Sequence, residues 1–208
     1  LRGDRPTLVL EVDVQAGVEV DQRAVDHLVA VLGQVVDKPG GIVLEGGNTF
    51  DDDRTTWTTD DLRGAVAANR STATTDDRVS VHVLYVAGSH ADDDGQTNAI
   101  GLAYSASTVA IFPQRWQGMV SLLGSSTAIE RAVLVHELGH LMALVNIGYQ
   151  SDIDHEDPDH PGHSSNRGSV MFHAIESTLI GQAFSGPPPD DFDDADRSDL
   201  EGLRTGRL

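Results

Sequence analysis

The sequence lacks cysteine altogether and contains a single lysine, Lys38, among its 208 residues. The absence of thiols excludes a disulfide scaffold, a thiolate metal site and a cysteine nucleophile. No apolar run approaches the roughly 18 residues that a membrane-spanning helix needs. Hydrophobic residues nevertheless make up 39% of the chain. This content excludes global disorder and predicts one domain over residues 1–208 with a sizeable core.

Positive charge is scarce, with 14 lysine and arginine side chains against 33 acidic ones and a net charge of -19. A surface this acidic repels phosphate, so we expect no nucleic-acid partner. The near-absence of lysine and the excess of aspartate resemble the proteins of extreme halophiles and predict a halophilic archaeal source. Charge repulsion should then weaken folding at low salt. Circular dichroism that showed full structure in dilute buffer would count against this interpretation.

The chain begins at Leu1 rather than methionine. We take this as the mark of a fragment or a processed chain, in which any leader or anchor that once preceded Leu1 is no longer seen. The expectation that follows is an exported or membrane-tethered protein.

Hydrophobic spacing changes along the chain between the period of a strand and that of a helix. Alternation at every second residue predicts strands at 8–14 and 79–85, a short apolar run predicts a buried strand at 42–44, and residues 99–104 and 109–112 are predicted to be extended as well. Spacing of three and four residues predicts helices at 21–36, 61–70, 127–146 and 190–205. Residues 46–60 and 148–168 are polar and are predicted to be loops. Sheet and helices mixed in one unit predict an α/β or α+β layer fold.

The most specific motif is His136-Glu137-Leu138-Gly139-His140, which matches H-E-x-x-H inside a predicted helix. Thr127 and Glu130 offer a capping box at the start of that helix. Imidazoles four residues apart project from one helical face and can bind one Zn²⁺ together. Glu137 is close enough to a metal-activated water to act as general base. The predicted helix is otherwise apolar on nearly every side. Charged and imidazole groups buried in it need a partner, and a metal ion supplies one.

This motif and a second one downstream resemble metzincin zinc metallopeptidases. Metzincins continue the motif with a glycine and a third histidine, and here Ala143 and Asn146 stand at those positions. His163 precedes Met171 by eight residues, the spacing at which matrixins and archaemetzincins place the third ligand before the Met-turn methionine. Ser164 and Ser169 occupy the archaemetzincin cysteine positions. The third histidine thus follows His140 by 23 residues instead of 6.

The resemblance covers about residues 99–172 and implies a single zincin-like α+β domain. Its sheet would be twisted and mixed, with an antiparallel edge strand, and would pack on a buried active-site helix. A C-terminal helix would complete the domain. Residues 1–147 would form the upper part, and residues 148–208 would carry the loop, the Met-turn and the last helix. Because Asn146 is a poor zinc ligand, we expect the helix to continue to Asn146 and to stop at Gly148. The resemblance favours His163 as third ligand, and four alternatives remain open: His155, His160, Asn146 and Glu176.

The resemblance also implies an activity, that of a zinc-dependent endopeptidase. Its substrate would pair with the edge strand formed by Ile100, Gly101, Leu102, Ala103 and Tyr104. Met171 would form an apolar floor below the metal, and the segment up to Leu179 would wall the specificity pocket. His173 stands where some metzincins have a tyrosine that assists the transition state, but we interpret it as a loop residue facing solvent. The alternative function is a zinc-stabilised peptide-binding module without turnover.

The loop 148–162 gathers acidic side chains and histidines, which are oxygen and nitrogen ligands for Ca²⁺ or for a second metal. It lacks the order of an EF-hand loop and the glycine that such a loop requires. In so acidic a chain we interpret it as a solvated loop rather than as a calcium site.

Overall fold

The computed structural model describes residues 5–95 and 98–208. Leu1, on which the expectation of an exported chain rests, lies outside the described residues. Within the described chain, no helix is long and apolar enough to cross a membrane.

A five-stranded mixed sheet forms the centre of the molecule, in the order β2-β1-β4-β7-β6. Its strands are β1 (Thr7–Gln15), β2 (Ile42–Phe50), β4 (Arg78–Tyr85), β6 (Gly101–Ser105) and β7 (Thr108–Ile111). The first four strands of this order pair in parallel, and β6 runs antiparallel to β7 at the edge. Two short strands, β3 (Thr56–Trp57) and β5 (Ser89–His90), pair separately. The predicted mixed sheet with an antiparallel edge strand is confirmed.

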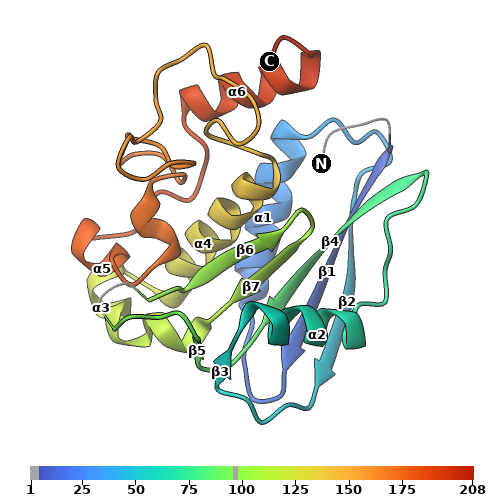
Figure 1. The fold of residues 1–208 in the computed structure, drawn as a ribbon, viewed down its shortest axis with the longest axis vertical. Helices are drawn as coiled ribbons and strands as arrows, with labels where there is room; N and C mark the ends of the chain where they lie inside the picture. Colours follow the sequence, from blue (N-terminus) through green and yellow to red (C-terminus); the bar gives the residue numbers. More distant parts are fainter. Residues whose placement is uncertain (1–4, 96–97) are drawn as a thin grey trace.

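Helices cover both faces of this sheet (Figure 1). One face packs against α1 (Gln22–Val35) and α4 (Ser126–Leu141), where Leu28, Val133 and Val81 belong to one buried cluster. The other face packs against α2 (Thr59–Asn69), where Leu62 lies in a second cluster. The buried helix α4 thus lies under the sheet beside its antiparallel edge.

Short helices and loops make up much of the remaining chain. The remaining helices are the 3-10 helices η1 (Pro113–Met119) and η2 (His173–Glu176) and the α-helices α3 (Val120–Leu123), α5 (Ile180–Ala183) and α6 (Asp194–Thr205). The helix α6 is the predicted C-terminal helix, and it begins at a capping box between Asp193 and Asp196. Figure 1 shows the loop after α4 and the segment up to α6 above α4.

The first strand differs from its prediction as a half-buried strand. Glu11 and Asp13, placed on its exposed face by the alternation, are both fully buried. Glu11 accepts hydrogen bonds from the backbone N–H groups of Ser71 and Thr72, and Asp13 lies 2.9 Å from the ring of buried His82. Strand β1 lies between two parallel strands, and the residues after α2 reach Glu11, so the polar residues are buried with partners.

The segment 46–60 is also not the continuous loop that its polarity predicts. Strand β2 continues to Phe50, and β3 and the first two residues of α2 lie within the same range. Pairing with β1 holds this polar segment extended, because an edge strand does not need an apolar face.

The start of α4 uses a different cap from the predicted box of Thr127 and Glu130. Ser125 is the N-cap residue, and its hydroxyl accepts the N–H of Ala128. Glu130 instead accepts the hydroxyl of Tyr85 at 2.9 Å and the N–H of Asp21 at 3.1 Å. The carboxylate therefore connects α4 to β4 and to the start of α1.

This buried carboxylate predicts a pH dependence of stability. Burial raises the pKa of Glu130 from 4.5 to about 7, against the opposing effect of the Tyr85 hydrogen bond. Between these values the folded protein keeps a proton that the unfolded chain releases, so the free energy of unfolding should fall as pH rises. We expect Glu130→Gln to flatten this part of the profile. Urea unfolding of both proteins from pH 4 to 8 measures it, and an unchanged slope would contradict the assignment.

Candidate metal centre

The helix α4 carries His136, Glu137 and His140 into the interior. His136 and Glu137 are fully buried, and the side chain of His140 is 14% exposed. Apolar residues surround them on the same helix, so packing fixes the helix against the sheet on nearly every side. The Nε2 atoms of the two histidines lie 3.0 Å apart, one helical turn from each other.

The helix ends earlier than predicted, at Leu141 rather than at Asn146. Ala143 has a φ of 66°, in the left-handed region, so the chain turns there without glycine. Val145 and Asn146 are left-handed as well, with φ values of 56° and 63°. This turn stands where the metzincin motif has its glycine, so the prediction of a continuous helix was wrong.

A left-handed alanine predicts a stabilising substitution at this turn. Because glycine adopts positive φ without steric penalty, Ala143→Gly should raise the free energy of unfolding by about 0.5–1 kcal/mol. Ala132→Gly, in the middle of α4, is the matched control and should lower it by about 1 kcal/mol or more. Chemical unfolding measures both. A loss of stability in Ala143→Gly would show that the left-handed turn is absent.

His163 is the histidine of the long loop that reaches the α4 pair. Its ring centroid lies 5.3 Å from that of His136 and 4.9 Å from that of His140. The backbone holds it there, because the N–H of the next residue, Ser164, donates to the carbonyl of Met171 at 2.8 Å. The eight-residue spacing between His163 and Met171 therefore has a physical basis in a closed loop.

The other sequence candidates lie elsewhere. His155 is buried against Asp199, with 2.9 Å between its Nε2 and a carboxylate oxygen. Asn146 donates to Glu156 and accepts the N–H of Ser151, which closes the loop after the helix. His160 stacks on the ring of another histidine, outside the α4 pair. Of the five candidates, only His163 and Glu176 lie together with His136 and His140.

Backbone and packing contacts hold this group in place. His136 Nδ1 lies 2.7 Å from the carbonyl oxygen of Val170, which only accepts, so Nδ1 carries the proton and Nε2 keeps its lone pair. Met171 is fully buried, and its sulfur packs so close to Gly139 that a Cβ at that position would collide with it. The sequence carries no signal for the Val170 contact, because a carbonyl group is common to every residue.

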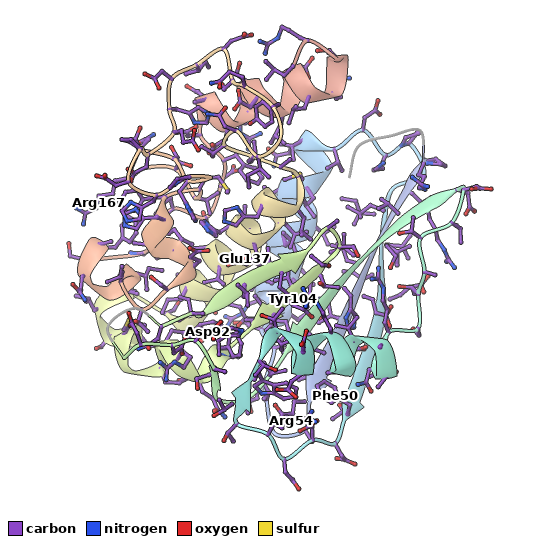
Figure 2. All side chains as sticks on the ribbon, in the orientation of Figure 1. Phe50, Arg54, Asp92, Tyr104, Glu137 and Arg167 are labelled. Atoms are coloured by element: carbon purple, nitrogen blue, oxygen red, sulfur yellow. The ribbon has the colours of Figure 1, made fainter. Side chains whose placement is uncertain are left out.

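Glu137 lies next to strand β6, on which Tyr104 is labelled in Figure 2. Within the described residues, neither of its buried carboxylate oxygens has a hydrogen-bond partner in good geometry, and the backbone of Ala103 only opposes the rise in its pKa. Gly101 makes room for it, because a Cβ there would collide with Glu137 Oε1. Burial, and then the charge of Glu176, raise the pKa of Glu137 well above its usual range. Gly101 was expected only as part of the edge strand, and its contact with Glu137 was missed.

Glu176, at the end of η2, completes the group. Its Oε1 lies 3.2 Å from His163 Nε2, and its Oε2 lies 3.7 Å and 3.8 Å from the Nε2 atoms of His136 and His140. Burial lowers the pKa of His140 to about 3, which keeps its ring neutral. The neighbouring histidines outweigh the effect of burial on Glu176 and hold its pKa below the usual range.

The loop 148–162 does not gather its acidic groups around one point. Asp152 pairs with Arg207, and Glu156 accepts hydrogen bonds from Asn146 and from the backbone of Gly162. The loop's Asp157 and His160 lie with His173, which is 19% exposed and whose ring stacks on His160 at 3.6 Å. His173 thus packs against the loop instead of facing solvent freely.

The donor set of the α4 group fits zinc. Three imidazole nitrogens and one carboxylate oxygen all lie within 4.8 Å of one another. Ligands about 2.0–2.1 Å from a tetrahedral zinc ion are separated by roughly 3.3 Å, close to the distances here. The Val170 carbonyl fixes the ring orientation of His136, as an outer contact to a metal ligand does, and the buried carboxylate of Glu137 lies beside the group.

Comparisons with known proteins agree with this architecture. No model of a protein family and no curated protein matches the sequence. Among solved structures, the chain resembles archaemetzincin from Methanopyrus kandleri, with 15% identity, a TM-score of 0.60 and coverage of 98% of this chain and 97% of that one. It also resembles a zinc-dependent peptidase from Methanocorpusculum labreanum, with 15% identity, a TM-score of 0.55 and coverage of 92% and 99%. The chain therefore has the α/β fold of these archaeal zinc peptidases.

Proposed function

We propose that this protein is a zinc-dependent endopeptidase of the metzincin type. One observation carries the proposal: the imidazoles of His136, His140 and His163 lie together beside the buried, unpartnered carboxylate of Glu137. A metal site of three histidines with an adjacent carboxylate is the constellation of a hydrolytic zinc centre. The likeness in fold to two zinc peptidases over nearly their whole length supports the same function.

Each residue of the site has a role in this proposal. His136, His140 and His163 hold the zinc ion, which when bound polarises a carbonyl and makes water a better nucleophile at neutral pH. Glu137 accepts the proton of the attacking water and delivers it to the leaving amine. Its position beside β6, in the space left by Gly101, keeps the carboxylate close to the strand where the substrate lies.

Strand β6 positions the substrate. It is the last strand of the sheet, so its outer edge is available to an extended peptide that adds as a further strand. Leu102, Ala103 and Tyr104 of the predicted contact segment lie within β6 and are partly exposed. Ile100 lies just before the strand, is fully buried and already donates its N–H to the carbonyl of Glu176.

A peptide-binding module without turnover is the second candidate. The Glu176 carboxylate among the three imidazoles favours it, because a fourth protein ligand is typical of structural zinc sites. Digestion of a peptide library by the purified zinc-loaded protein separates the two functions. We expect cleavage that 1,10-phenanthroline stops and added zinc restores. Bound zinc without any cleavage would favour the binding module.

A further inference from the structure

The segment 176–178, which begins at the last residue of η2, lies beside the candidate metal centre. We propose that Glu176 is a displaceable fourth metal ligand and that this segment holds the peptidase closed in its resting state. The inference rests on the proposed function and adds a form of regulation to it. Two independent contacts carry it, one made by a side chain and one by the backbone.

The first contact is that of the carboxylate with the imidazoles. Glu176 Oε1 lies 3.2 Å from His163 Nε2, and Oε2 lies 3.7 Å from His136 Nε2. A catalytic zinc site keeps three protein ligands and leaves the fourth position for water or substrate. Here an oxygen donor of the chain itself stands at that position, so a substrate carbonyl has to replace it.

The second contact is that of the backbone with the start of the edge strand. Ile100 donates its N–H to the carbonyl of Glu176 at 2.8 Å, and Thr178 donates its N–H to the carbonyl of Asn98 at 2.9 Å. Ala99 and Ser177 form an antiparallel bridge between these two bonds. A peptide that extended along β6 would need the same backbone groups. The segment therefore pairs with the residues that lead into the substrate strand, while its carboxylate lies among the three imidazoles.

The Glu176 side chain reaches solvent and so has room to leave the imidazoles. The 3-10 helix η2 is a single turn of four residues, and the Glu176 side chain is 33% exposed. The backbone of the segment is bonded to residues 98–100, but partial exposure of the carboxylate is typical of a group that opens locally at low free energy. A peptide that paired with Asn98 and Ile100 would release the segment and, with it, the carboxylate. Substrate binding and opening of the metal centre are thus one event.

Cobalt-substituted protein and acetohydroxamate, a small ligand for an open metal position, test this inference. Visible absorption reports the ligands of Co²⁺, and titration gives the hydroxamate affinity. We expect Glu176→Ala to bind acetohydroxamate at least about tenfold more tightly than the parent does. In the parent, the ligand binds only to the minor population in which Glu176 has left the metal, and the variant removes this limit. Peptide turnover should rise by a similar factor. Glu19→Ala removes an exposed glutamate and is the control that should match the parent.

Equal hydroxamate affinity in the parent and in Glu176→Ala would overturn the inference, whatever the cleavage activity. Loss of cobalt from Glu176→Ala would also overturn it, because Glu176 would then be an indispensable ligand rather than a displaceable one. A different result would contradict the proposed function alone: Glu176→Ala binds cobalt and hydroxamate tightly but cleaves no peptide. The two failures are therefore distinguishable.

Discussion

We expect Glu137→Gln to lose peptide cleavage while it keeps its zinc. Glutamine has nearly the same shape as glutamate but cannot accept the proton of the attacking water. General acid–base catalysis contributes about 10²–10⁴-fold, so kcat should fall by at least this factor. The metal content should remain that of the parent, because Glu137 lies outside the group of donor atoms that gathers around His136. Activity assays and metal analysis of the same preparation measure both effects.

Glu130→Gln is the matched control for this substitution. It makes the same chemical change at a buried carboxylate on the same helix, two turns before Glu137. Glu130 contacts Tyr85 and Asp21 rather than the metal centre, so cleavage should continue. If Glu137→Gln cleaved peptides as fast as the parent, another group would have to be the general base.

The second large effect is expected from His163→Ala, which should lose zinc. Loss of an outer contact to a metal ligand weakens metal binding by roughly 10–100-fold, and loss of a ligand itself should weaken it further. With the imidazole removed, the centre keeps two histidines and Glu176. Zinc content after dialysis against a weak chelator measures the effect.

His160→Ala is the control, because this histidine belongs to the same loop but stacks on His173 outside the metal centre. It should keep the zinc of the parent. Full zinc occupancy in His163→Ala would refute the assignment of the third ligand and would make Glu176 the residue to examine next.

Much of the fold was predictable because its causes are local. Alternating apolar residues at 79–85 correspond to β4, and Asp21 caps α1 as its position before an amphipathic segment indicates. The metal-site motif was recognisable because its spacing is that of one helical turn. The identity of the third ligand needed a family resemblance, since no helical or strand period connects His163 to His140.

The misses have non-local causes. Propensity favours a continued helix at Ala143, but tertiary packing forces a left-handed turn there. The burial of Glu11 depends on Ser71 and Thr72, which are about sixty residues away in the sequence. The position of Glu176 depends on bonds between residues 98–100 and 176–178, which no sequence period indicates. Adaptation to high salt stays a prediction, as does the cellular location.

Anomalous diffraction at the zinc absorption edge, from crystals grown with zinc, tests the central claim most directly. The account predicts one strong peak bonded to the Nε2 atoms of His136, His140 and His163, at about 2.0–2.1 Å from each. If zinc were abundant in the crystal and the imidazoles of His136 and His140 held none, the centre described here would not be a metal site.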